Sequence, residues 1–274
     1  MPTDKSSLPG QQGITLHRSV LVQPQLAVRT SQIEARYEVL EAAHQEGGPV
    51  AVGWFLTPGQ QFVPTASSVT FGAVFPPENL AAMLGEILTG PVGDWIRNEL
   101  GGRVACDVDQ GWIRRQYAPG NYPRFHSPHG WHQDGALGFD YLSQADGSFP
   151  AAALLSMVTC WIALTPCGLE APGLELVTRR LEGLVAPTEL TDERIQARFA
   201  MEEFVRPVLA PGDALLFRGD ILHRTYVTPA MTKDRTSIEL RFFPAENLPA
   251  RLKADRFIPL IFPNWIPPAG VGGE

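Results

Sequence analysis

The stretch GDALLFRGDILH, residues 212–223, decides the fold class of this 274-residue chain. It begins with a Gly-Asp turn signal, continues as a short apolar run, and reaches a second Gly-Asp turn signal before His223. His223 then opens the next extended run. Two short strands joined by a tight turn, with a histidine on the second strand, are typical of a protein built from β-sheets.

Short strands broken by glycine and proline fill the chain from about residue 103 onward, and a strand pair is predicted within residues 54–75. The other expected strands are residues 103–108, 111–118, 129–134, 154–164, 174–177, 204–209, 213–218, 222–227 and 235–243. About eight antiparallel strands with turn signals favour a double-stranded β-helix, or jelly roll. We therefore predict a mainly β fold with a jelly-roll core and flanking helices.

Helical spacing of apolar residues marks the N-terminal part and one later insert. The predicted helices are residues 27–47, a segment after Pro77 that ends near Leu88, a short piece at 95–100, and residues 188–200 with Thr191 as N-cap. No linker or repeat divides the chain, so we expect one domain over residues 1–274. Its expected parts are a disordered leader (1–13), a helical N-terminal part (14–102), a jelly-roll core (103–245) with a helical insert (178–203), and a C-terminal tail (246–274).

Charge and hydropathy exclude several classes of protein. The chain has 22 basic and 29 acidic residues and a net charge of -7, and a net acidic field repels nucleic acid and anionic membranes. The longest apolar stretch, residues 151–164, is too short and polar to span a bilayer, and the N-terminus lacks the apolar segment of a secretory signal. Three cysteines without metal-type spacing indicate reduced thiols. We expect a cytoplasmic protein whose partner is a small molecule, and the sequence leaves the oligomeric state open.

A metal-binding pattern begins with the tetrapeptide WHQD at residues 131–134. On an extended chain residues i and i+2 face the same way, so His132 and Asp134 can point at one spot. With His223 they supply two imidazoles and one carboxylate, the facial triad that is typical of non-haem Fe(II) oxygenases. Such a triad leaves three coordination positions open, enough for a bidentate 2-oxo acid and O₂.

A cation must hold the far carboxylate of such a 2-oxo acid, and the strand RTSIELR at residues 235–241 offers two. Arg235 is preferred because its planar fork binds carboxylate bidentately, and Ser237 on the same strand face adds a hydroxyl. Thr225 likewise lies on the face of His223. Arg241, further along the same face, stays open as a second candidate or as a structural ion-pair partner.

These motifs resemble the phytanoyl-CoA dioxygenase family of Fe(II)/2-oxoglutarate oxygenases. The similar stretches are WHQD (131–134), WIALTP (161–166), APGLELV (171–177), GDALLF (212–217), LHRT (222–225) and RTSIELRFF (235–243). The resemblance implies iron held by His132, Asp134 and His223, with 2-oxoglutarate and O₂ as co-substrates. It assigns the distal carboxylate of 2-oxoglutarate to Arg235 with Thr225, places Trp161 beside it, and puts either Arg115 or Gln116 near it. Residues 177–180 and the helical insert depart from the family pattern, so substrate choice is not carried over.

Aromatic residues and one histidine flank the metal motif on loops, where enzymes often bind their substrates. The candidates are Tyr122, Phe125, His126, Trp131, Phe139 and Tyr141. We expect a small or medium organic molecule, hydroxylated at an unactivated C–H with release of succinate and CO₂, as part of secondary metabolism.

Other interpretations remain open at this point. His126, His129 and His132 could bind zinc, although Pro128 and Gly130 indicate a bent loop there. A cupin-like metalloenzyme that does not use 2-oxoglutarate shares the facial triad without needing Arg235. A jelly-roll binding protein without catalysis is a third possibility. Asp134 argues against a halogenase, because halide needs the carboxylate's place on the iron.

Overall fold

Two antiparallel sheets form the body of the computed structural model, which describes residues 13–45, 53–55, 61–62, 77–121, 128–136, 154–248 and 257–260. The large sheet contains β1 (Ile14–His17), β2 (Gly53–Phe55), β3 (Gln61–Phe62), β4 (Val104–Gln116), β5 (Val158–Ala163), β8 (Ala214–Arg218), β10 (Arg235–Pro244) and β11 (Phe257–Leu260). Its order is β1-β8-β5-β10-β4-β2-β3, with β11 also paired to β4. The small sheet has the order β7-β6-β9, from β6 (Gly173–Val177), β7 (Phe204–Val205) and β9 (His223–Tyr226).

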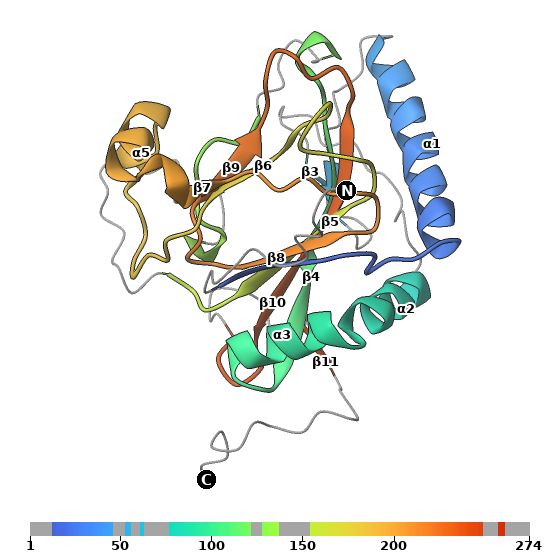
Figure 1. Ribbon diagram of the computed structural model, residues 1–274. Helices are drawn as coiled ribbons and strands as arrows, with labels where there is room; N and C mark the ends of the chain where they lie inside the picture. The colour runs from blue at the N-terminus through green and yellow to red at the C-terminus, as the bar shows by residue number, and fades with distance from the viewer. Residues whose placement is uncertain are drawn as a thin grey trace, which may run out of the picture.

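The N-terminal helices cover the outer face of the large sheet (Figure 1). They are α1 (Gln25–Gln45), α2 (Pro77–Leu88) and α3 (Pro91–Leu100). Apolar residues from all three pack in one cluster with Ile238, Leu240 and Phe242 of β10. Burial of this apolar surface, at roughly 25 cal/mol per Å², holds the helices to the sheet.

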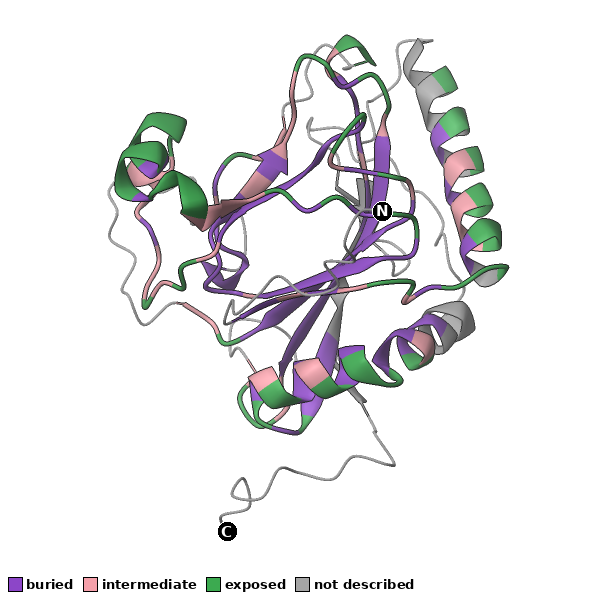
Figure 2. Cartoon of the chain, in the orientation of Figure 1, coloured by how far each residue is buried: buried purple, intermediate pink, exposed green. Residues whose placement is uncertain are grey.

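The opposite face of the large sheet looks toward the small sheet. Trp161 on β5 and Phe217 on β8 share a buried cluster with Leu174 and Leu176 of β6. Strand alternation puts Arg235, Ser237, Glu239 and Arg241 on this inner face, and all four are buried (Figure 2). The space between the sheets is therefore partly apolar and partly lined by charge, which is the arrangement of a jelly roll with an internal site.

Most predicted elements are confirmed, with shifted ends. The two strands expected at 103–108 and 111–118 form the single strand β4, whose register against β10 shifts between Glu239 and Arg241. The expected helix at 188–200 is the shorter α5 (Asp192–Arg198) after a 3-10 turn, η4 (Pro187–Glu189). Its N-cap is Thr191, as predicted, with the hydroxyl accepting from the backbone N–H of Arg194. Strand β1 was not predicted, since Ile14–His17 fell in the part expected to be helical.

The predicted strand at 129–134 is wrong. His132 makes only an isolated antiparallel bridge to His223, and Asp134 opens a 3-10 turn, η2 (Asp134–Ala136). The chain bends there because the Gly135 backbone N–H donates to the carbonyl of Gly219 at 2.9 Å. A Cβ at Gly135 would lie 2.8 Å from that oxygen, so this close approach requires glycine.

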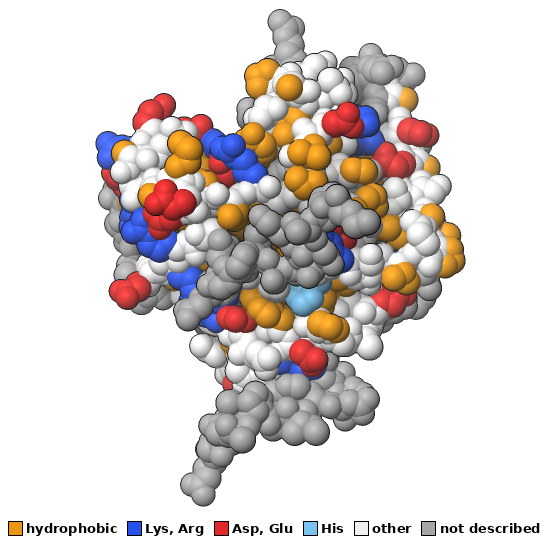
Figure 3. Space-filling model, in the orientation of Figure 1, with side chains coloured by type: hydrophobic (Ala, Val, Ile, Leu, Met, Phe, Trp, Pro, Cys, Tyr) orange, Lys and Arg blue, Asp and Glu red, His pale blue; other side chains and the backbone are white. Residues whose placement is uncertain are grey.

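The surface gives further context. Acidic and basic side chains lie intermixed on the face that Figure 3 shows, with a dense group on the side of α5. No helix within the described ranges is long and apolar enough to cross a membrane. The expected leader at 1–13, apart from Gly13, and most of the tail at 246–274 lie outside the described residues.

Candidate metal centre

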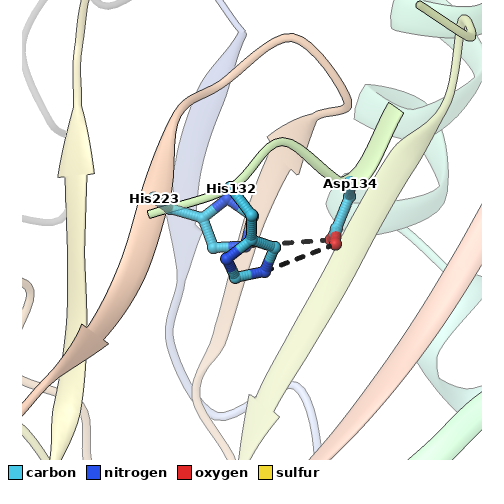
Figure 4. Close-up of side chains that lie close together, drawn as sticks. All are labelled: His132, Asp134 and His223. Carbon is cyan, nitrogen blue, oxygen red and sulfur yellow. Dashed lines mark ion pairs between the residues drawn. The ribbon is translucent and has the colours of Figure 1, made fainter. Parts of the chain in front are cut away.

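Three side chains from two segments far apart along the chain converge between the sheets (Figure 4). His132 and His223 lie side by side because their backbones exchange two hydrogen bonds of 2.9 and 3.0 Å. Their Nε2 atoms lie 3.8 and 4.0 Å from the carboxylate oxygens of Asp134, and the three possible ligand atoms all lie within 4.8 Å of one another. Two imidazoles and one carboxylate at this spacing can hold a divalent metal ion.

The backbone sets both imidazoles in the form that binds metal. Nδ1 of His132 lies 2.7 Å from the carbonyl of Gly130, and Nδ1 of His223 lies 3.1 Å from the carbonyl of Ile221. A proton on Nδ1 that donates to the carbonyl leaves the Nε2 lone pair free to face Asp134. Burial, reinforced by the neighbouring His223, lowers the pKa of His132 to about 4, and burial also lowers the pKa of His223. Both rings are therefore neutral near pH 7.

Asp134 is held ionised. Burial, the largest single effect, raises the pKa of this carboxyl, but Arg241, the two neighbouring histidines and the Thr159 hydroxyl together outweigh it, and the pKa stays well below its usual range. Arg241 Nη2 donates to Oδ1 at 3.0 Å, and the Thr159 hydroxyl donates to Oδ2 at 2.5 Å. Arg241 and Thr159 are direct partners across β10 and β5, so the sheet itself orients the carboxylate.

A group of buried polar atoms lacks partners a short way along the inner face of β10. Arg235 is fully buried, with its guanidinium 4.9 Å above the ring of Trp161 and its backbone opposite Gln116 on β4. Within the described part of the chain, the atoms without a hydrogen bond include Arg235 Nε and Nη1, Ser237 Oγ, Trp161 Nε1 and Gln116 Oε1. Buried polar groups are normally satisfied, and a buried cation needs an anion. The donors among them, Arg235 Nε and Nη1, Ser237 Oγ and Trp161 Nε1, therefore fit a bound carboxylate.

The register settles which neighbour on β4 faces this group. Gln116 and Arg235 are cross-strand partners on the inner face, so Gln116 lies beside the buried guanidinium. Arg115 points to the outer face, where it pairs with Glu34 on α1 and stacks on Tyr37. The structure thus favours Gln116 over Arg115, the choice that the sequence left open.

Arg114 is an inner-face residue that sequence reasoning missed. It is buried opposite Ser237, and its Nη1 lies 2.7 Å from Nδ1 of His129. The ring of His129 lies 5.7 Å from that of His132, so Arg114 stands near the triad. Burial lowers the pKa of Arg114 to about 10. Alternation from Gln116 by two residues was the signal that could have identified it.

The other candidates are placed as follows. Thr225 is buried on β9, two residues after His223 and on the same face. Trp131 is buried among apolar residues beside α5, and its indole N–H donates to Asp192 at 2.9 Å. The remaining substrate candidates lie outside the described residues: Tyr122, Phe125, His126, Phe139 and Tyr141. Among the described residues the group that could hold a metal is His132, Asp134 and His223, without His129.

Fold and site together define the class of protein. A jelly roll that brings two histidines and one carboxylate together, beside a buried arginine whose Nε and Nη1 have no partner in the described part of the chain, is a non-haem iron and 2-oxoglutarate-dependent dioxygenase. The chain belongs to the phytanoyl-CoA dioxygenase family, PhyH, whose family model matches residues 38–229. This membership confirms the resemblance seen in the sequence.

Solved structures support the same fold. EctD from S. alaskensis, in its apoform, has a TM-score of 0.54 at 16% identity, over 86% of this chain and 75% of that chain. The carbocyclase SnoK from nogalamycin biosynthesis has a TM-score of 0.53 at 16% identity, over 92% of this chain and 93% of that chain. HygX from Streptomyces hygroscopicus, with nickel and 2-oxoglutarate bound, has a TM-score of 0.53 at 15% identity, over 85% of this chain and 83% of that chain. The search of curated proteins found no match.

Proposed function

We propose that this protein hydroxylates an unactivated C–H bond of a small or medium organic molecule and converts 2-oxoglutarate to succinate and CO₂. His132, Asp134 and His223 would hold the iron, which supplies the activation of O₂ coupled to decarboxylation of the 2-oxo acid. Neutral imidazoles and an ionised carboxylate suit Fe(II), because all three ligands are already in the unprotonated form.

The binding of 2-oxoglutarate falls to the buried group on β10. Arg235 would bind the distal carboxylate through the Nε and Nη1 atoms that have no partner among the described residues. The Ser237 hydroxyl and the Trp161 indole N–H would add donors, with Gln116 alongside and Thr225 on the facing strand. Trp161 also stacks under the guanidinium and fixes its plane.

One observation carries the proposal: the fully buried Arg235 lies among unsatisfied polar atoms on the sheet face that also bears Arg241 and Thr159, the hydrogen-bond partners of Asp134. A metalloenzyme that does not use a 2-oxo acid, or a binding protein without catalysis, has no need for a buried cation without an acid partner. The substrate-facing roles of His126, Phe139 and Tyr141 stay part of the proposal, whereas Trp131 is buried among apolar residues with its indole N–H on Asp192.

A cytoplasmic location and a role in secondary metabolism complete the proposal. None of the three cysteines is in a disulfide and all three are buried, which suits a reducing compartment. The carbocyclase of similar fold serves a biosynthetic pathway, which supports a comparable setting here.

The test is an anaerobic titration followed by turnover. Fe(II) is added to the metal-free protein, then 2-oxoglutarate, and the ferrous charge-transfer band is recorded. Succinate is then measured in air with a panel of organic molecules. The proposal expects the band, its loss in Asp134→Ala, and succinate release that increases with at least one substrate. Absence of the band in wild-type protein, with iron bound, contradicts the use of 2-oxoglutarate.

A further inference from the structure

One carboxylate of the helical insert contacts the neighbours of both histidines. Asp192, the first residue of α5, accepts a hydrogen bond on Oδ1 from Trp131 Nε1 at 2.9 Å. The same Oδ1 accepts from Arg224 Nη1. Trp131 directly precedes His132, and Arg224 directly follows His223. A single side chain from the insert therefore joins the two segments that carry the imidazoles.

The two neighbours also contact each other and the sheet beneath. The guanidinium of Arg224 lies 4.8 Å from the centre of the Trp131 ring, a cation–π contact. Arg224 Nε donates to the buried Glu175 of β6 at 2.6 Å, which anchors it to the small sheet. We call Asp192, Trp131 and Arg224 the histidine clamp.

The residue on the other side of His132 is tied to the same region. Gln133 Oε1 accepts from the backbone N–H of Val185 at 2.8 Å, and its Nε2 donates to the carbonyls of Gly183 and Asp220 at 3.2 and 3.0 Å. His132 is thus held between two side chains that both bind residues of the insert or its flanks. It lies in no regular strand, and a single pair of backbone hydrogen bonds joins it to His223, so these side-chain contacts add to the positioning that a longer ladder provides elsewhere.

We propose that Asp192 is a positioning residue that sets the distance between His132 and His223 and so raises the affinity of the triad for metal. This inference rests on the proposed metal centre. Groups that orient metal ligands from outside the coordination sphere typically change metal affinity by about 10- to 100-fold when they are removed. Asp192 acts through its neighbours rather than by touching a ligand, so we expect the lower end of that range.

The histidine clamp allows a test that separates an effect on the position of the metal ligands from an effect on the stability of the fold. The Asp192 side chain is 52% exposed, and exposed ion pairs contribute little to folding. Glu193 is an exposed acid one residue further along the same helix turn, which makes Glu193→Ala a matched control for the lost charge near the helix N-terminus. Asp192→Asn keeps an oxygen acceptor for the indole N–H, and Trp131→Phe keeps an aromatic ring against Arg224 but removes the N–H donor together with part of the ring.

The experiment is a calorimetric titration of the metal-free protein with Mn(II), which gives the dissociation constant of the metal. The melting temperature of each variant is measured on the same samples. We expect Asp192→Ala and Trp131→Phe to bind Mn(II) about tenfold more weakly than wild type. Asp192→Ala should keep the melting temperature of wild type, whereas Trp131→Phe, a smaller residue in a buried cluster, should lower it and still be folded at the temperature of the titration. Asp192→Asn should recover most of the affinity, and Glu193→Ala should match wild type. Trp131→Phe keeps the test decisive if Asp192→Ala does not fold.

Two results would overturn the inference in different ways. If Asp192→Ala and Trp131→Phe bind Mn(II) as tightly as wild type does, the histidine clamp has no effect on metal affinity, and the proposed metal centre still stands. No Mn(II) binding by wild type, under conditions where the protein is folded, removes the proposed metal centre itself and the clamp with it.

Discussion

Arg241 Nη2 lies 3.0 Å from Asp134 Oδ1 and fixes the carboxylate of the metal centre to β10. Both side chains are largely buried, and removing one partner of a buried ion pair leaves the other charge uncompensated. We expect Arg241→Gln to lower the free energy of unfolding of the metal-free protein by about 3 kcal/mol, measured in urea at pH 7. The control is Arg103→Gln, which changes an exposed pair with Glu246 and should cost about 0.5 kcal/mol or less.

The same ion pair predicts a pH dependence of stability. The folded-state pKa of Asp134 lies below its unfolded value, so its contribution is fully present above about pH 4 and is lost as the pH falls through the lower folded value. Arg241→Gln removes the strongest of the groups that lower this pKa. The difference in unfolding free energy between wild type and variant should therefore shrink as the pH falls below about 4. A constant difference from pH 7 to pH 3 would contradict the assignment.

Arg235 should control the affinity for 2-oxoglutarate and not that for metal. A charge-assisted hydrogen bond contributes about 1.5–3 kcal/mol, so Arg235→Gln should weaken the binding of 2-oxoglutarate by about tenfold to a hundredfold. The binding is measured from the intensity of the ferrous charge-transfer band as 2-oxoglutarate is added. Iron affinity should not change. Arg115→Gln is the matched control, because Arg115 lies on the outer face against Glu34 and Tyr37. Equal losses in the two variants would show that the effect is not specific to the inner face.

Metal should stabilise the folded chain through the two histidines. Mn(II) at a hundred times its dissociation constant should raise the unfolding free energy by about 2.7 kcal/mol, seen as a higher melting temperature. His223→Ala should abolish this rise, because it removes a buried ligand atom of the triad. His17→Ala, a histidine of β1 outside the triad, should keep it. A metal-induced rise that survives in His223→Ala would place the metal elsewhere.

The alternation of side chains along a strand explains which parts of the site could be predicted from the sequence. Alternation along β10 put Arg235 and Ser237 on one face without knowledge of the fold, and the structure buries both on the inner face. The choice between Arg115 and Gln116 could not be made, because it depends on the pairing register of β4 with β10, and that register contains an irregularity.

Long-range contacts explain what the sequence did not reveal. The bend at Asp134 depends on the approach of the Gly135 backbone to Gly219, far away along the chain. Trp131 was expected to face a substrate, but nothing local to residue 131 indicates a hydrogen bond to Asp192 in the insert. Such contacts are created by tertiary packing, so single-sequence patterns do not contain them.

The cysteine thiols should be unreactive in the folded protein. All three are buried, and burial raises the pKa of Cys160 to about 12 and that of Cys167 to about 11. An unperturbed thiol, with a pKa near 8.5, gains thiolate steeply between pH 7 and pH 9, whereas these two should not. We therefore expect Ellman's reagent to label no cysteine of the native protein at either pH and all three after denaturation in urea. Labelling of one equivalent that rises from pH 7 to pH 9 would show that a thiol is exposed and that the packing described around it is wrong.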